Sequence, residues 1–198
     1  MSMSDESFQT PEEMDAHYGP AGPVAAALVW MNAILTAGDY ADAWAHMTDE
    51  LRLVRSQAWL WNNRKFFGRE AETLDQQATT LAAVPSSHPY WKEFAEIELR
   101  SFQSAWPPGD YAHVGVASRP RPLAPGLELV LFLRMEAAEA LGNATTVSDG
   151  VVDIAGGEDE GTAVEAFAQI VVEHDGTQWR VASHSGPQMP TPGWPPVF

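Results

Sequence analysis

The stretch that most constrains the fold of this 198-residue chain is VEAFAQIVVEHDGTQWRVASHSG at 164–186. Apolar and polar residues alternate on both sides of Asp175-Gly176, and an Asp-Gly pair between two alternating runs predicts a β-hairpin with a two-residue turn. Such a turn pairs His174 with Thr177. The chain is therefore expected to contain an antiparallel sheet whose two faces differ in polarity.

The predicted register gives the hairpin one apolar face and one mixed face. Ile170 and Val181 fall on the apolar face, which we expect helices to cover, whereas Phe167 and His184 fall on the mixed face. A one-residue bulge would exchange the faces on one strand, so this assignment depends on the register.

A second alternating run, GLELVLFLRME at 126–136, predicts another strand. Its leucines fall on one side, and Phe132 and Arg134 fall on the other. We expect the leucines to join the apolar face of the sheet. Phe132 and Arg134 then share the mixed face with Phe167 and His184.

The N-terminal half of the chain carries helical patterns. A helix is predicted from Pro23, because apolar residues recur there at three- and four-residue spacing. Gly38 ends this helix, and Asp39 and Thr48 are expected to cap the two that follow. We expect residues 62–106 to form a largely helical insert.

Helices followed by strands indicate an α+β fold, with N-terminal helices packed on an antiparallel sheet. We expect residues 1–22 to be a mobile acidic leader and residues 23–186 to be a single domain. Residues 187–198, PQMPTPGWPPVF, contain five prolines and suit neither a helix nor a central strand. This tail is expected to be extended, and either pinned by Trp194 and Phe198 or loose.

The chain carries a net charge of −16, from 27 acidic against 11 basic residues. A field of this sign repels phosphate backbones, so we expect no nucleic-acid partner. No run approaches the roughly 18 apolar residues that would span a membrane. The first residues also lack the apolar centre of a secretory signal. We therefore expect a cytoplasmic protein without a membrane partner.

Cysteine is absent, and the six histidines are scattered along the chain. Disulfides, thiolate zinc sites and cysteine nucleophiles are therefore excluded. The sequence also lacks the HExxH spacing of zinc ligands, a glycine-rich nucleotide loop and a GxSxG motif. We expect no metal and no cofactor.

Two segments carry a resemblance to a known family. LTAGDYADAWAHMTDEL at 35–51 and DGTQWRVASHSG at 175–186 resemble, in this order, the opening and closing parts of the nuclear transport factor 2-like superfamily, which includes SnoaL-like cyclases and ketosteroid isomerases. The resemblance implies a curved sheet wrapped around helices, a cone-like shape with an apolar pocket, and a homodimer formed through the outer face of the sheet. The insert at 62–106 departs from the family pattern.

The isomerase branch of that superfamily has two catalytic positions that can be sought here. Its oxyanion-binding tyrosine falls on or near Met31, and methionine cannot donate a hydrogen bond. Its aspartate base falls in LRLVRSQAWLWNN at 51–63, which contains no acid. Neither catalytic residue of the isomerases is present at its matching position. The sequence therefore identifies no catalytic residues and does not decide whether the protein is an enzyme.

Eight tryptophans, most of them in the helical half, are the most unusual feature of the composition. They are ordinary core residues, or they line a pocket for a flat apolar ligand. The second alternative predicts that an apolar small molecule binds in an aromatic-lined cone, at Trp30, Trp44, Trp61, Phe132, Arg134, Phe167 and His184. In it Arg134 pairs with Glu136 or Glu165, and His184 serves as a base. The alternative function is a non-catalytic homodimeric assembly module.

Overall fold

A computed structural model describes residues 11–67, 71–83, 85–106, 115–116, 120–133, 146–148, 151–153, 163–165 and 168–198. The helical elements are α1 Pro11–Tyr18, α2 Pro23–Asn32, the π-helical turn η1 Ala33–Ala37, α3 Tyr40–Ala45, α4 Asp49–Asn62, α5 Arg64–Phe67, α6 Ala71–Ala83, the 3₁₀ turn η2 Pro85–Ser87 and α7 Trp91–Ala105. The strands are β1 Gly115–Val116, β2 Arg121–Ala124, β3 Leu127–Leu133, β4 Thr146–Ser148, β5 Val151–Asp153, β6 Ala163–Glu165, β7 Ala168–His174 and β8 Trp179–Ser183. The predicted α+β class is confirmed.

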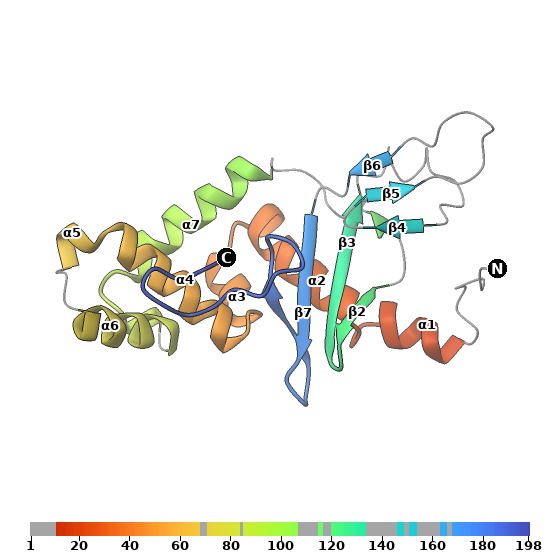
Figure 1. The fold of residues 1–198 in the computed structure, drawn as a ribbon, viewed down its shortest axis with the longest axis horizontal. Coiled ribbons are helices and arrows are strands. Elements are labelled where there is room, and N and C mark those ends of the chain that lie inside the picture. Colours follow the sequence, from red (N-terminus) through yellow and green to blue (C-terminus); the bar gives the residue numbers. More distant parts are fainter. Residues whose placement is uncertain are drawn as a thin grey trace.

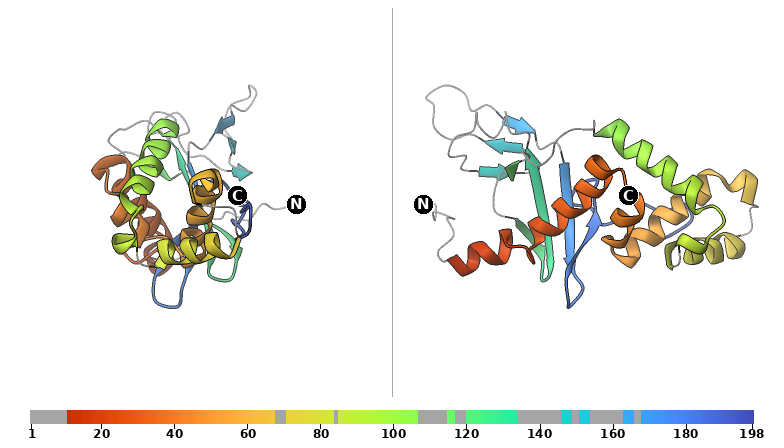
Figure 2. Two further views of the ribbon diagram at one scale, coloured as in Figure 1. Left: turned by 90° about the vertical axis from the view of Figure 1, so that its left-hand side faces the viewer. Right: turned by 180° about the vertical axis from the view of Figure 1, so that it is seen from behind.

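The main sheet is antiparallel and has the order β1-β3-β7-β8, with β2 also paired to β3. Strands β4, β5 and β6 form a second, small antiparallel sheet. Helix α2 lies across one face of the main sheet and packs on β3, β7 and β8 (Figures 1 and 2). Sheet and α2 thus form the two layers that the order of predicted elements suggested.

The predicted insert at 62–106 forms helices α5, α6 and α7, which extend the molecule beyond the sheet (Figure 1). Helix α6 packs on α4, and α7 packs on α3 and η1. The insert therefore enlarges a helical half of the molecule, whose core holds the aromatic rings of Tyr40, Trp44, Trp59, Trp91 and Phe94.

One strand residue joins the helical half to the sheet. Val181 in β8 donates its backbone N–H to the carbonyl of His46 over 2.8 Å and accepts the N–H of Thr48 over 2.8 Å. These bonds make a parallel bridge between Met47 and Val181 at the edge of the sheet. The edge of β8 is thereby paired, and the link between α3 and α4 is held against it.

The predicted helix caps are present. Gly38 ends η1 with a φ of 66°, a conformation that suits glycine. The carboxylate of Asp39 accepts the N–H of Asp42 over 3.0 Å, and the hydroxyl of Thr48 accepts the N–H of Leu51 over 3.2 Å. Both side chains satisfy a first-turn donor that the helix itself leaves unpaired.

The predicted two-residue turn of the hairpin is wrong. His174 pairs with Trp179, and Val172 with Val181, so the loop spans residues 175–178. The cause is the carboxylate of Asp175, which accepts the N–H groups of Thr177 over 2.8 Å and Gln178 over 3.0 Å. These bonds hold a longer loop than the Asp-Gly pair alone predicts.

A bulge in β8 places His184 on a different face of the sheet from the predicted one. The pairing shifts from Val172↔Val181 to Val171↔Ser183, which leaves Ala182 as the extra residue. Because a bulge of one residue exchanges faces, His184 turns from the predicted mixed face to the face covered by helices.

The predicted faces of β3 are also wrong. Phe132 pairs with Ala168 and Val130 with Ile170, which places Phe132 on the face covered by α2. The leucines lie on the outer face, where Leu129 and Leu131 are 3% and 4% exposed. Over residues 129–132 both faces of this strand are apolar and buried. Composition therefore could not decide between them, because only the register ties the face of one strand to that of its neighbour.

The predicted leader is partly ordered. Residues 11–18 form α1, which packs on α2, and the imidazole Nδ1 of His17 lies 3.4 Å from Glu128 Oε2 on β3. Residues 1–10 lie outside the described part of the chain. Part of the predicted leader is thus helical and in contact with the domain, and its mobility stays a prediction.

One helical stretch, Asp15–Ala37, is long and apolar enough to cross a membrane by length and composition alone. Half of the most apolar 18-residue part of this stretch is buried inside the fold, and Trp30 and Met31 within the stretch have no exposed area. Burial of this kind is also what the core helix of a globular domain shows.

The Thr48 cap supports the junction between the two halves, and its contribution can be measured. We expect Thr48→Val, which keeps the shape but loses the acceptor, to lower the free energy of unfolding by about 1–2 kcal/mol. Thr48→Ser, which keeps the acceptor, is the matched control and should stay within about 0.5 kcal/mol of the parent. Urea unfolding followed by circular dichroism measures both, and equal losses in the two variants would contradict the capping role.

Candidate functional site

Polar and aromatic side chains gather where the end of β8 meets α2 and α7. The imidazole of His184 stacks on the indole of Trp30, with centroids 5.6 Å apart and planes at 15°. The ring of Phe102 meets the same imidazole edge-on at 4.8 Å. Trp106, at the end of α7, lies 6.0 Å from Trp30. The bulge in β8 creates this arrangement, because it turns His184 toward the helices.

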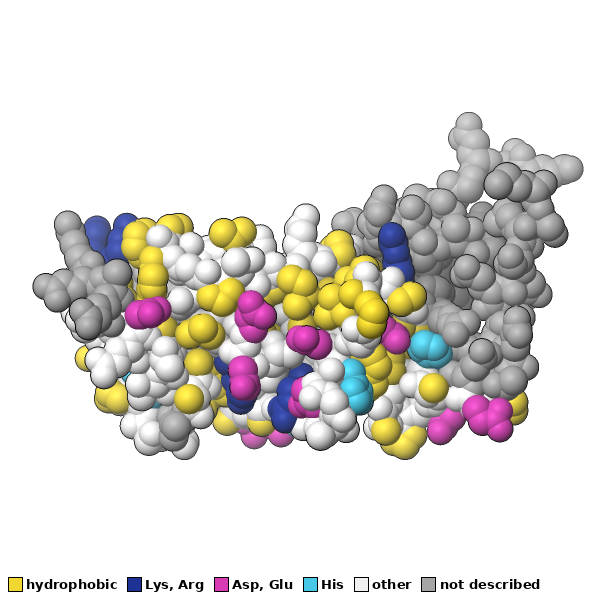
Figure 3. Space-filling view, turned by 60° about the horizontal axis from the view of Figure 1, so that its bottom comes forward, with side chains coloured by type: hydrophobic (Ala, Val, Ile, Leu, Met, Phe, Trp, Pro, Cys, Tyr) yellow, Lys and Arg dark blue, Asp and Glu magenta, His cyan; other side chains and the backbone are white. Residues whose placement is uncertain are grey.

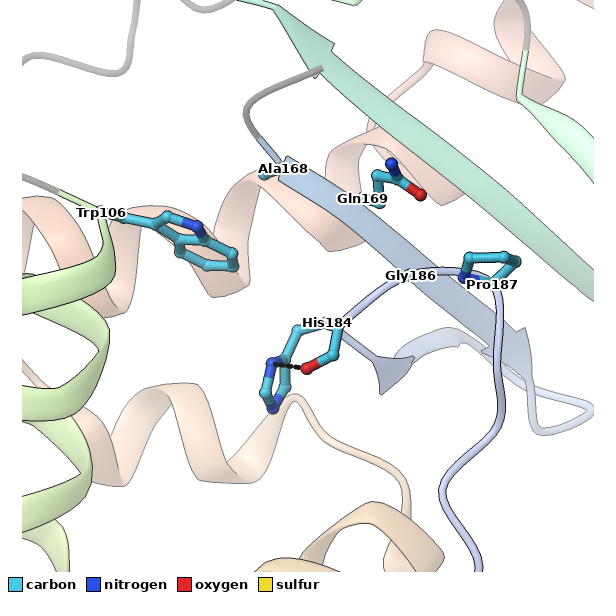
Figure 4. Close-up of a pocket in the computed structure, with 7 residues that line it drawn as sticks. Trp106, Ala168, Gln169, His184, Gly186 and Pro187 are labelled. Atoms are coloured by element: carbon cyan, nitrogen blue, oxygen red, sulfur yellow. Dashed lines mark hydrogen bonds between the residues drawn. The ribbon is translucent and has the colours of Figure 1, made fainter. Parts of the chain in front are cut away.

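A hollow of about 290 Å³ opens beside this cluster. It is lined by residues from the end of α7, the start of β7 and the segment after β8, namely Trp106, Ala168, Gln169, His184, Ser185, Gly186 and Pro187. Figure 4 shows Trp106 across the hollow from Gly186 and Pro187. The volume lies at the lower end of the range of about 300–1,000 Å³ that small-molecule sites occupy.

His184 is neutral at physiological pH. Burial, together with the positive charge of Arg55 nearby, lowers the pKa of His184 to about 3. Its Nδ1 atom lies 3.2 Å from the hydroxyl of Ser185 (Figure 4). Its Nε2 atom is buried and has no hydrogen-bond partner among the described residues. A ligand in the hollow therefore meets the Ser185 side of the ring, while Nε2 points to the interior.

A buried ion pair lies behind the cluster. The guanidinium of Arg55 on α4 contacts the carboxylate of Glu98 on α7, and both side chains are at most 15% exposed. The hydroxyl of Tyr40 on α3 donates to Glu98 Oε2 over 3.4 Å, and the guanidinium lies 5.1 Å from the ring of Phe102. The pair as a whole carries no net charge, although the guanidinium of Arg55 acts on the imidazole of His184.

The ion pair shifts the pKa values of its neighbours. Burial and the Glu98 carboxylate hold the pKa of Tyr40 well above its usual value. Burial opposes the charge of Arg55, but Glu98 and Tyr40 outweigh it and raise the pKa of Arg55. The arginine stays charged and the tyrosine stays a hydrogen-bond donor across the physiological range.

The contact between Ser185 and His184 invites comparison with a nucleophile and its base. Ser185 lies past the end of β8, where the alternation of a strand no longer separates adjacent side chains. A histidine with a pKa near 3 is a weak base at neutral pH, and a triad would place a third group on its other nitrogen. The described residues place none there. The contact holds the imidazole of His184 beside the hydroxyl of Ser185.

Three of the predicted ligand-binding residues belong to the core. Trp44 and Phe132 are 1% and 0% exposed and pack among other apolar side chains. Trp30 has no exposed area either, but its ring forms the support on which His184 stacks. Of the predicted set, the structure brings together Trp30 and His184.

Of the remaining predicted residues, the structure describes Trp61 alone. Trp61 is partly exposed at the end of α4, where its ring meets Trp194 and the guanidinium of Arg64. Arg134 and Phe167 lie outside the described residues, and so does the predicted pairing of Arg134 with an acid.

Sequence reasoning missed Arg55, Glu98 and Phe102. A signal for Glu98 was present, because Phe94, Glu98 and Phe102 recur every four residues and so share one helix face. A carboxylate between two buried rings of one face indicates a buried charge that needs a partner. The partner on α4 is 43 residues away in sequence and could be found only in the folded chain.

The described residues contain no group of three histidine, aspartate or glutamate side chains that could hold a metal ion. Comparison with family models, with curated proteins and with solved structures gave no match for this chain. The site is therefore interpreted from its own geometry.

The neutrality of His184 predicts a pH dependence of stability. Because its pKa is lower in the folded chain than in the unfolded chain, the unfolded chain takes up a proton first as the pH falls below about 6.5. The stabilisation is complete above that pH and is lost as the pH falls toward 3. We expect this loss to reach about 2 kcal/mol at about pH 5.

His184→Gln, which does not titrate, should remove that part of the slope. Urea unfolding of the parent and the variant across this pH range measures the difference, and the groups titrating elsewhere cancel in the comparison. The same slope in both chains would contradict a neutral buried imidazole.

The ion pair predicts unequal costs for single and double substitution. Arg55→Met leaves the Glu98 carboxylate buried without its partner and should cost about 3–5 kcal/mol of unfolding free energy. The double variant Arg55→Met/Glu98→Leu should cost less than that single variant. Arg52→Met is the control, because the partner of Arg52, Asp49, is 93% exposed and such a pair is worth under about 1 kcal/mol. Additive losses at Arg55 and Glu98 would rule out the coupling.

Proposed function

We propose that this protein binds a small, flat, uncharged molecule in the hollow beside His184. The observation that carries the proposal is the arrangement around the hollow. An indole from the end of α7 forms one wall, a neutral imidazole held on Trp30 forms another, and the polar residues Gln169 and Ser185 also line the hollow. Apolar walls with a few placed polar groups are typical of small-molecule sites.

The charges of the protein do not favour an anionic ligand. The net charge is −16, and acidic side chains are interspersed with hydrophobic ones on the face shown in Figure 3. An anion would be repelled by this field. The ion pair of Arg55 with Glu98 behind the hollow carries no net charge as a whole. The hollow thus offers a stacking surface and hydrogen bonds rather than a counter-ion.

This proposal keeps the ligand class predicted from the sequence and moves the site. Trp30 and His184 remain in it, while Trp106, Gln169 and Ser185 replace the rings that lie in the core. The resemblance to the nuclear transport factor 2-like superfamily, the cone-like pocket and the cytoplasmic location stay predictions. A homodimer through the outer face of the sheet also stays a prediction, although Leu129 and Leu131 on that face are already buried within one chain.

Ligand-observed NMR with two neutral aromatic probes, indole and 2-naphthol, tests the site. We expect both probes to bind the full-length protein, and Trp106→Ala to weaken binding by about tenfold or more, because the stacking wall is lost. Trp61→Ala is the matched control, since it removes the same side chain from the far end of α4.

The two variants separate a specific site from general affinity for aromatic surfaces. Weaker binding in Trp106→Ala with unchanged binding in Trp61→Ala is the expected result. Equal binding in the parent and Trp106→Ala would exclude the hollow as the site. Native mass spectrometry of freshly purified protein adds a second readout, because a retained ligand would appear as excess mass that is absent from Trp106→Ala.

A further inference from the structure

The proline-rich segment that follows the hollow lies against the helical half of the molecule (Figure 1). Its residues 191–198 form a small closed turn, in which the N–H groups of Thr191 and Val197 donate to each other's carbonyls over 2.9 and 3.1 Å. A side chain on Gly193 would place Cβ only 3.2 Å from the carbonyl oxygen of Pro195, so the turn favours glycine there. The tail therefore lies against the body in this turn, and it is not extended over residues 191–197 as predicted.

Polar contacts hold the turn on α4 and α6. The N–H of Gly193 donates to Gln57 Oε1 over 3.0 Å, and the indole Nε1 of Trp194 donates to Asp75 Oδ1 over 3.1 Å. The amide Nε2 of Gln57 reaches the same Asp75 oxygen over 3.5 Å. Gln57 is 3% exposed, so the hydrogen bond from the tail satisfies a buried acceptor.

Ring contacts complete the docking. The indole of Trp194 lies 6.5 Å from that of Trp61 and packs against the core. The ring of Phe198 lies 5.6 Å from the guanidinium of Arg55, on which Phe102 also packs. An aromatic anchor among polar contacts that fix its orientation is how many proteins bind extended peptides.

We infer that the face formed by Gln57, Trp61 and Asp75 on α4 and α6 is a docking site for a proline-rich turn centred on tryptophan, and that the tail of a second copy of this chain can occupy it. We call this face the tail-docking face. The inference does not depend on the proposed ligand in the hollow.

A second copy is the occupant that the contacts specify. The tail of another copy carries the same Gly193 and Trp194 and can repeat every contact without a new surface. Exchange of tails between two copies is therefore a low-cost route to a dimer. In an intact monomer the connection at 187–190 keeps the tail at a high effective concentration, so it docks within its own chain. Exchange becomes visible when a chain's own tail cannot dock.

Two complementary full-length variants test the exchange. Trp194→Ala has an intact docking face and a defective tail, while Asp75→Ala has an intact tail and a defective face. Each variant alone should have the same subunit count as the parent chain. Their mixture should form a one-to-one complex in native mass spectrometry, because the tail of Asp75→Ala can dock on the face of Trp194→Ala.

A peptide in trans provides a second measurement. A labelled peptide MPTPGWPPVF, identical to residues 189–198, should bind Trp194→Ala with a Kd below about 1 mM. The double variant Trp194→Ala/Asp75→Ala should bind it at least about tenfold more weakly. A peptide with alanine in place of tryptophan is the matched control and should not bind. If Trp194→Ala does not fold, Gly193→Val in the full-length chain disables the tail instead.

The outcomes divide clearly. A complex in the mixture, or peptide binding that depends on Asp75, supports the inference. Folded variants that form no complex and bind no peptide at about 1 mM would overturn it. So would an assembly of either variant alone that is larger than that of the parent chain, because it would use a surface other than the tail-docking face. Neither result bears on probe binding at Trp106, so this inference and the proposed function can fail separately.

Discussion

The backbone pairing of Val181 with His46 and Thr48 is the interaction on which the rest of the structure depends. It closes the edge of β8 and fixes the link between α3 and α4 against the sheet. The bulge at Ala182 comes directly after Val181 in the strand and turns His184 toward α2 and α7. The helical half, the sheet and the candidate site therefore meet within a few residues of one strand.

Charges inside an aromatic core are tolerated here because they are paired. The ion pair of Arg55 with Glu98, joined by the hydroxyl of Tyr40, links three helices around Phe102. Removing two charges from water is costly, so such a pair contributes more to a single arrangement of the helices than to net stability. The imidazole of His184 is neutral, because burial and the nearby cation Arg55 disfavour its protonated form.

The segment after β8 serves two regions of the molecule. Gly186 and Pro187 form part of the wall of the hollow, and the chain then continues to the tail-docking face on α4 and α6. Gly186 has a φ of 109°, a conformation that side-chain-bearing residues rarely adopt, so the path of the chain between the two regions favours glycine there. The tail is thus an integral part of the fold as well as a segment that other copies can supply.

The sequence by itself determined the α+β class, the caps at Asp39 and Thr48, the helical insert and the existence of the hairpin, because these depend on periodicity and on bonds between near neighbours. Only the tertiary structure decided the register, the bulge, which face of β3 meets α2, and the ion pair of Arg55 with Glu98. Each of these depends on contacts between distant segments. When both faces of a strand are apolar, alternation cannot say which one turns inward. The position of His184, and with it the candidate site, was therefore fixed by packing alone.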